Sequence, residues 1–273
     1  MKTTKKHLEL FHILLCGVFC TLALGGQMRA QSLGLAPAQV VEKFKPGVPF
    51  QFDLSTVNTG DTPVDMHVEI TDFWYNEKNE KVFSSAGSSP RSAANWIQFV
   101  PDHFEVAAHG SQKMKAIVTP PADAKGGYYA TLFVQSKPEL SFPRNDGKGV
   151  YTSMRIGCLV LLKAEDTEEY KIEISNVKLT PPAEAHSLSV DFDLLNASNT
   201  HVFPVARVAV LDSSRKLVAK AESGEKRFLP GQRNSMHVEW AGKLPAGNYT
   251  AVLTVAYGED RIETQQVPFT VAQ

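Results

Sequence analysis

The sequence predicts an all-β protein of two immunoglobulin-like antiparallel β-sandwiches that follow a cleaved signal peptide. After residue 31, short runs of alternating or β-branched apolar residues recur, and no window keeps apolar residues at helical spacing for three turns. Glycine, proline, asparagine and aspartate separate these runs. The acidic segment Glu165-Asp166-Thr167-Glu168-Glu169 divides them into two groups of seven, the strand number of an immunoglobulin sandwich.

The first thirty residues have the order of a secretory signal peptide. Lys2, Lys5 and Lys6 come first, an uncharged run extends from Leu10 to Leu24, and small residues lead to Ala30. As a helix that run spans about 22 Å, which is short of the ~30 Å hydrocarbon core. We therefore expect export with cleavage after residue 30, and no stable membrane anchor afterwards.

Cleavage would change the totals of the chain. The full sequence has 273 residues, three cysteines and a formal charge of −1. The remaining 243 residues would carry 24 basic and 28 acidic residues, a formal charge of −4, and a single cysteine, Cys158. An intramolecular disulfide is then impossible, and the apolar neighbours of Cys158 predict a buried strand residue rather than a reactive thiol.

The expected domains are residues 31–164 and 165–273. The strands expected in the first are 38–44, 50–57, 64–73, 96–99, 112–118, 128–135 and 152–162. Those expected in the second are 170–177, 187–195, 205–211, 217–221, 235–240, 249–256 and 261–271. Residues 76–94 are predicted to form a long exposed hairpin or loop, and residues 136–149 a second loop; both are either binding loops or plain connections.

The two halves repeat the same local devices. Each has an Asn-rich turn after its second strand, beginning at Asn58 in the first half and at Asn196 in the second. Each later has a Gly- or Asn-containing turn into a strand led by a tyrosine, Tyr128 or Tyr249. Such a tyrosine can bond back to the backbone of the turn, so we interpret the repeat as a fold device without chemistry.

Composition and motifs exclude several functions. With 43% hydrophobic and 21% charged residues the chain is not disordered, and its near-neutral charge lacks the basic footprint of a nucleic-acid binder. Nucleophile elbow, metalloprotease helix, phosphate loop and dinucleotide fingerprint are missing from the sequence, and no two histidines of the mature chain lie within four residues. We predict no catalytic residue, no metal and no cofactor.

The segment from Tyr151 to Lys163 is the most informative strand. Every second residue on one face is apolar: Met154, Ile156, Cys158, Val160 and Leu162. Such a strand either completes the sandwich or forms an edge that pairs with a strand of another protein. In the second case these five residues are the candidate contacts to the partner strand.

The first half resembles the first domain of PapD-like pilus-assembly chaperones over about residues 33–164. The resemblance rests on the order of Leu35-Ala36-Pro37-Ala38-Gln39-Val40, Lys45-Pro46-Gly47, Val57-Asn58-Thr59-Gly60-Asp61, Trp96-Ile97 with Pro101, Pro120-Pro121-Ala122-Asp123 with Gly127-Tyr128, and Met154-Arg155-Ile156. It implies an exported, ATP-independent chaperone that lends its last first-domain strand to a pilin.

The resemblance also implies a cationic clamp for the pilin carboxylate, with an arginine on the first strand and a lysine on the last. The matching positions are Gln39 and Gly157, and neither is cationic. Four nearby cations are the candidate replacements: Lys43, Lys45, Arg155 and Lys163.

We therefore expect a non-enzymatic periplasmic, or otherwise surface-exposed or secreted, protein that binds a pilin-like subunit by strand complementation. The alternative is a cell-surface or wall-associated adhesion module that uses loops and aromatic residues. A polypeptide partner distinguishes the first hypothesis, and binding to wall or glycan without one distinguishes the second.

Overall fold

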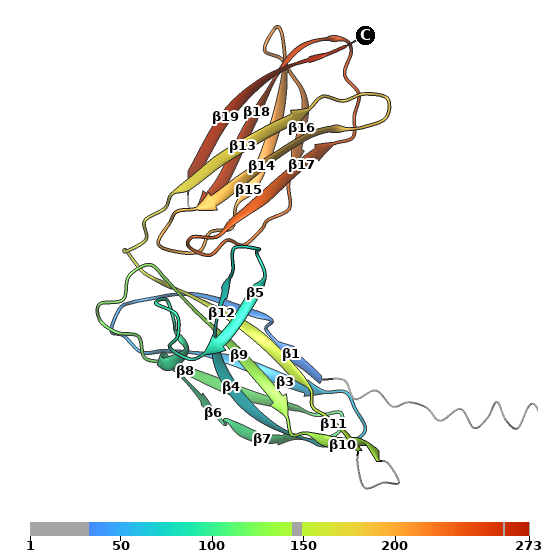
Figure 1. The fold of residues 1–273 in the computed structure, drawn as a ribbon. Helices are drawn as coiled ribbons and strands as arrows, with labels where there is room; N and C mark the ends of the chain where they lie inside the picture. Colours follow the sequence, from blue (N-terminus) through green and yellow to red (C-terminus); the bar gives the residue numbers. More distant parts are fainter. Residues whose placement is uncertain (1–32, 144–148, 259, 273) are drawn as a thin grey trace, which may run out of the picture.

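The computed structural model describes residues 33–143, 149–258 and 260–272. They form two β-sandwiches joined end to end at an angle (Figure 1), each with its own apolar core. The predicted signal peptide lies outside the described residues. In the described part, no helix is long and apolar enough to cross a membrane.

One sheet of the first sandwich has four strands in the order β1-β3-β8-β6. Their bounds are β1 Leu33–Ala36, β3 Phe50–Asn58, β8 Ser111–Val118 and β6 Ile97–Val100. In β8 every second residue, from Met114 to Val118, is buried and the others are exposed. This alternation places one face of the sheet on the core and the other in solvent, as period-two patterning requires.

The facing sheet has the order β2-β12-β9-β4-β5, with β7 paired to β4. The bounds are β2 Gln39–Phe44, β12 Arg155–Ala164, β9 Gly127–Ser136, β4 Val64–Tyr75, β5 Lys81–Ser85 and β7 His103–Val106. A short 3-10 helix, Ala94–Trp96, precedes β6. Nine of the ten residues of β9 are buried or half-buried apolar or small side chains. One face of this strand meets the core, while on the other face Tyr129 meets the second domain and Phe133 packs against Phe83 of β5.

The second sandwich packs a three-stranded sheet, β13-β14-β17, on a four-stranded sheet, β16-β15-β18-β19. The bounds are β13 Ile172–Thr180, β14 Leu188–Asn196, β17 Arg233–Trp240, β16 Leu217–Glu222, β15 Val205–Asp212, β18 Gly247–Gly258 and β19 Arg261–Val271. All fourteen strands predicted from the sequence are present, and the all-β class is confirmed.

Five strands were not among the fourteen predicted, although β5 agrees with the hairpin that was one of the two alternatives predicted for residues 76–94. β1 precedes the first predicted strand, β7 is a short addition to β4, and β5 turns residues 76–94 into a hairpin with β4. Beyond Ser136, β10 Glu139–Pro143 pairs with β11 Gly149–Thr152 in a separate two-stranded sheet. The prediction of a loop over residues 136–149 was therefore wrong, because this segment contains β10 and the start of β11.

The repeated sequence devices are also confirmed. Asn58 and Asn196 are fully buried, and each side chain caps its own turn: the amide of Asn58 donates to the backbone oxygens of Thr62 and Val106, and that of Asn196 to those of Thr200 and Phe228. The Tyr249 hydroxyl donates to the Pro245 oxygen at 2.8 Å. The Tyr128 hydroxyl accepts from the Lys125 backbone N–H at 3.2 Å. These bonds close the corners of both sandwiches.

Candidate functional site

Strand β12 is only partly enclosed by its sheet. It pairs with β9 from Arg155 to Lys163, but with β2 only from Leu159 onward, where the Leu159 backbone N–H donates to the Ala38 oxygen at 3.1 Å. In the described ranges, residues 155–158 have no strand on that side. Backbone groups alternate between the two neighbours of a strand, so Gly157, two residues before Leu159, directs its N–H to this open edge.

The predicted partner-strand residues do not lie together at this edge. Cys158, Val160 and Leu162 have no exposed surface and belong to the core of the first sandwich. Met154 and Ile156 are half-buried and lie at the open end. The alternation of apolar residues along β12 therefore mostly reflects packing in the core of its own domain. Of the five candidate contact residues, a partner strand can reach only Met154 and Ile156. Burial also raises the pKa of the Cys158 thiol to about 12 and makes it unreactive.

The opposite face of β12 meets the second domain. Leu161 is fully buried and Leu159 half-buried in an apolar cluster that contains Leu229 and Phe203 of the second sandwich. Their partners from the first domain are Phe73, Tyr75 and Tyr129. Strand β12 thus contributes to a domain core with one face and to the interdomain contact with the other.

Position 157 of β12 has room only for glycine, because a side chain of the neighbouring strand β9 lies against it. A Cβ atom at this position would lie 2.8 Å from the Phe133 ring. The Arg155 guanidinium lies over the same ring, 3.6 Å from its centroid, and donates to Glu69 at 2.6 Å. Arg155, one of the four candidate anchors, is therefore already paired on this face.

The other three candidate cations lie where β2 and β12 run side by side: Lys43 and Lys163 are register partners on these strands, and Lys45 follows Lys43 by two residues. Lys43 is exposed on β2 and lines a shallow pocket with Glu165, Asp166 and Glu168. Lys45 follows β2 and is exposed. Lys163, near the end of β12, lines a pocket together with residues of the second domain.

Arg227, which sequence reasoning missed, brings a cation to Gln39 from the second domain. Its guanidinium donates hydrogen bonds to the side-chain oxygen of Gln39 and, at 2.9 Å, to the Tyr75 hydroxyl. Its Nε atom is buried without a hydrogen-bond partner in the described structure. Gln39 is thus in contact with an arginine of the other domain.

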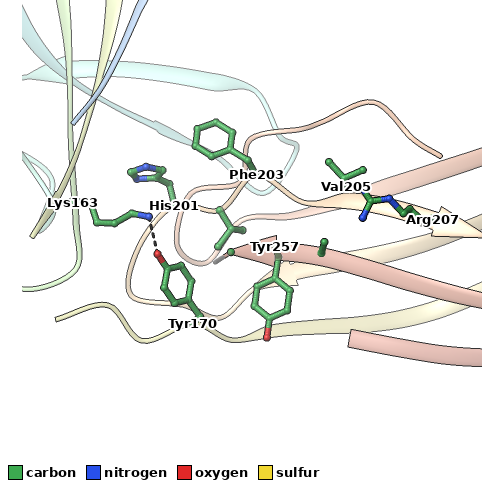
Figure 2. A pocket seen from close by; sticks show the side chains of 10 residues that line it. Lys163, Tyr170, His201, Phe203, Val205, Arg207 and Tyr257 are labelled. Carbon is green, nitrogen blue, oxygen red and sulfur yellow. Dashed lines mark hydrogen bonds between the residues drawn. The ribbon is translucent and has the colours of Figure 1, made fainter. Parts of the chain in front are cut away.

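Figure 2 shows the interdomain pocket, a hollow of about 310 Å³ to which Lys163 and Tyr170 contribute from one side. His201, Phe203 and Arg207 contribute from the second sandwich. His201 is 1% exposed, and burial, reinforced by the positive charges of Lys163 and Arg227, lowers its pKa to about 3. Its ring packs edge-on against Tyr129, 5.8 Å away, and against Phe203 at 5.5 Å.

A backbone contact beside this pocket holds the domains together. The Gly127 backbone N–H donates to the Asn199 carbonyl oxygen at 2.9 Å, and the Asn199 amide donates to the Thr167 oxygen at 2.9 Å. A further bond joins the Gly126 backbone N–H to the Thr167 hydroxyl at 2.9 Å. Among the described residues, no group of three or more His, Cys, Asp or Glu side chains has the geometry to hold a metal ion.

Comparisons with known proteins find structural similarity only. No family model matches the chain, and no curated protein matches it in sequence. Among solved structures, the class 5 fimbriae chaperone CfaA has 11% identity and a TM-score of 0.46, over 89% of this chain and 100% of that one. The E. coli chaperone DraB has 16% identity and a TM-score of 0.41, over 89% and 97%. In a complex of the Salmonella enterica SafA pilin with the SafB chaperone, the matching chain has 12% identity and a TM-score of 0.41, over 89% and 98%. The chain is thus similar to these chaperones over most of its length, at low sequence identity.

Proposed function

We propose that this chain is an exported, non-enzymatic chaperone for a fimbrial or other surface-structure subunit, which it binds by adding a partner strand to the open edge of β12. The observation that carries the proposal is the stretch from Arg155 to Cys158, which pairs with β9 on one side and, in the described residues, has no strand on the β2 side. Unpaired backbone groups at an edge are a template for another strand. Met154 precedes this stretch and Ile156 lies within it.

The hairpin next to the edge supports the same proposal. Leu140, Val150 and Tyr151 of β10 and β11 are exposed, and Tyr151 exposes 67% of its surface. Large apolar side chains that project together beyond a sheet are typical of protein-binding surfaces. A partner strand on the β12 edge would extend along this hairpin and cover part of its apolar surface.

The position of Arg227 suggests which end of the partner strand lies in the cleft. An added strand must end where β2 takes over the edge, at Ala38 and Gln39. The Arg227 guanidinium lies at this point, and its Nε has no hydrogen-bond partner in the described structure. A strand parallel to β12 would end here with its carboxylate, and an antiparallel strand would begin here with its ammonium group. The positive charge favours the carboxylate, so we place the anchor at Arg227 and not at Lys43, Lys45 or Arg155.

The test is co-purification of this chain from the cell that produces it, followed by reconstitution with the purified subunit that it recovers. Ile156→Asp should abolish complex formation, because a charge at the edge opposes pairing with an apolar partner. Ile262→Asp, at an exposed isoleucine of β19 in the second domain, is the matched control and should bind normally. Circular dichroism melting shows whether each variant is folded.

Equal recovery of the subunit with folded Ile156→Asp and with wild type would reject strand addition at β12. Binding to isolated cell wall without any polypeptide would instead support an adhesion module. For the anchor, Arg227→Gln should weaken the complex about 10- to 100-fold, the range of one charge-assisted hydrogen bond. It should have no effect on a subunit whose C-terminus is amidated.

A further inference from the structure

Two histidines lie side by side on the outer face of the first sandwich. His67 of β4 and His103 of β7 are directly opposite each other in the register of these antiparallel strands. Their rings are stacked, with the centroids 5.8 Å apart and the planes 22° from parallel. Residues opposite each other on one face of a sheet have Cβ atoms about 4.5–5.5 Å apart, so both rings can reach one small ligand.

Both imidazoles are accessible and lack a polar partner. His67 is half-buried and His103 is exposed, since the core packs on the opposite face of both strands. Among the described residues, neither ring has a hydrogen bond or an ion pair. His109 and His237, by contrast, each bond the carboxylate of an aspartate. A neutral imidazole has one nitrogen that accepts, so the pair offers two nitrogen lone pairs.

The charges around the pair do not oppose a cation. Asp65 and Glu105 lie opposite each other two residues further along the same face, and Glu105 is exposed. The Asp65 carboxylate bonds the Lys137 ammonium group, which lowers the pKa of Asp65, so it is ionised and balances the lysine. The Arg155 guanidinium is balanced in the same way by Glu69. The net charge of these five side chains is therefore negative.

We propose that His67 and His103 together bind one divalent transition-metal ion of the zinc and copper class. Imidazole is the commonest protein ligand for metals and suits zinc, copper and nickel. Each ring gives one nitrogen. Water holds the remaining positions, since no third His, Cys, Asp or Glu side chain of the described residues completes a site. The ion would fasten the short strand β7 to β4.

The histidine pair is separate from the surfaces proposed to bind a partner subunit. His67 precedes Tyr75, which meets the second domain, by eight residues, about 26 Å along β4. Strand β9 lies between His67 and the open edge of β12, where Gln135 is opposite both His67 and Arg155. Figure 1 shows β7 at the end of the first sandwich away from the second domain. The inference therefore does not depend on strand addition.

The probe is zinc chloride, added at pH 7 to the chain without its predicted signal peptide and without a histidine tag, in a buffer that does not bind metals. Nuclear magnetic resonance follows the imidazole signals. We expect those of His67 and His103 to shift together and to saturate at one zinc ion per chain. Magnesium chloride should shift neither, because Mg²⁺ prefers oxygen ligands.

His103→Gln should weaken zinc binding by at least about tenfold, since even the loss of an outer-shell partner costs about 10- to 100-fold in metal affinity. His109→Gln, at another exposed histidine of the same domain, is the matched control and should bind as wild type does. An ion that binds only the folded chain raises its melting temperature. Zinc should therefore raise the melting temperature of wild type and of His109→Gln more than that of His103→Gln.

Three results would overturn the proposal: His67 and His103 signals that zinc does not move, equal shifts with magnesium, or zinc binding by folded His103→Gln as tight as that of wild type. None of these results bears on the co-purification experiment, so failure of the metal site and failure of the proposed chaperone function remain distinguishable.

Discussion

Arg227 of the second domain donates a hydrogen bond to the side-chain oxygen of Gln39 at the start of β2 in the first domain. The same guanidinium reaches Tyr75 at the end of β4, so one side chain joins two strands of one sheet to the other sandwich. The bonds lie beside the apolar interdomain cluster. Together they give the two domains one defined arrangement.

Removing the Arg227 guanidinium should therefore weaken the coupling of the domains. For Arg227→Gln we expect a loss of about 1–3 kcal/mol in the free energy of unfolding, since two hydrogen bonds to a half-buried charged group disappear. Scanning calorimetry should show the single transition broadening or separating in two. Lys220→Gln is the control, at an exposed lysine for which the described structure shows no hydrogen bond. Equal transitions in both variants would show that Arg227 contributes nothing to coupling.

The contact between Gly126 and Asn199 gives a second prediction. Gly126 has a φ of +71°, and a Cβ there would overlap the Asn199 carbonyl oxygen of the second domain. Gly231 has a φ of +78°, but a Cβ there would meet nothing within 4 Å. Gly231→Ala should therefore cost only the backbone strain, about 1 kcal/mol. Gly126→Ala should cost about 1–3 kcal/mol more, because the domains must move apart.

Urea unfolding of the two glycine variants measures this difference directly. The pair separates the strain of a left-handed backbone, which both share, from the interdomain overlap, which only Gly126 has. Losses of the same size would mean that the chain accommodates a methyl group at Gly126 without disturbing the interface.

The fold was predictable because its signals are local. Strand alternation, the Asn58 and Asn196 turns, and the tyrosine corners each depend on residues a few positions apart. The face of β12 was harder to interpret. Its apolar alternation has the same appearance whether Val160 packs inside its own sandwich, as it does, or against a partner.

The candidate site was less predictable because it depends on distant contacts. Arg227 lies 188 residues from Gln39 in the chain and has no distinctive sequence around it. Position 157 cannot carry a lysine because the Phe133 ring on the neighbouring strand fills the space. This contact follows from the register of β9 with β12, which the sequence does not show. His201 is one of eight histidines in the sequence, and only the packing of the folded chain shows that it is buried.

The buried turn asparagines should be essential to their own domains. Asn196 is fully buried; its amide donates to the oxygens of Thr200 and Phe228 at 2.9 and 3.0 Å, and its oxygen accepts the Ser198 N–H at 2.9 Å. Asn196→Ala removes three buried hydrogen bonds, so we expect a loss of about 3–5 kcal/mol in unfolding free energy. Asn248→Ala, at an exposed asparagine that bonds Thr270, should lose less than about 0.5 kcal/mol.

Equilibrium denaturation followed by tryptophan fluorescence is the measurement, since Trp240 lies in the same sandwich as Asn196. A loss for Asn196→Ala no larger than that for Asn248→Ala would show that water replaces the missing amide and that the turn does not need it.

Protonation of His201 should make stability depend on pH. The ordinary histidine pKa is near 6.5, and in the folded protein burial and the charges of Lys163 and Arg227 lower the pKa of His201 to about 3. Between these pH values the imidazole is protonated in the unfolded chain but neutral in the folded protein. The stability that comes from the neutral, buried imidazole is therefore fully present above about pH 6.5, and it decreases as the pH falls toward 3. At pH 4.5 the loss should be about 2–3 kcal/mol relative to pH 7.

His201→Phe isolates this contribution, because phenylalanine keeps a ring between Tyr129 and Phe203 but cannot be protonated. Three aspartates with lowered pKa values also reduce the stability of the protein as the pH falls: Asp65, Asp193 and Asp212. Their effect is the same in wild type and in His201→Phe, so it cancels in the comparison. Urea unfolding at pH 7 and 4.5 should thus show a smaller decrease for His201→Phe than for wild type, by about 2–3 kcal/mol. The same decrease in both proteins would mean that the imidazole is already charged at neutral pH, or that it remains in contact with water.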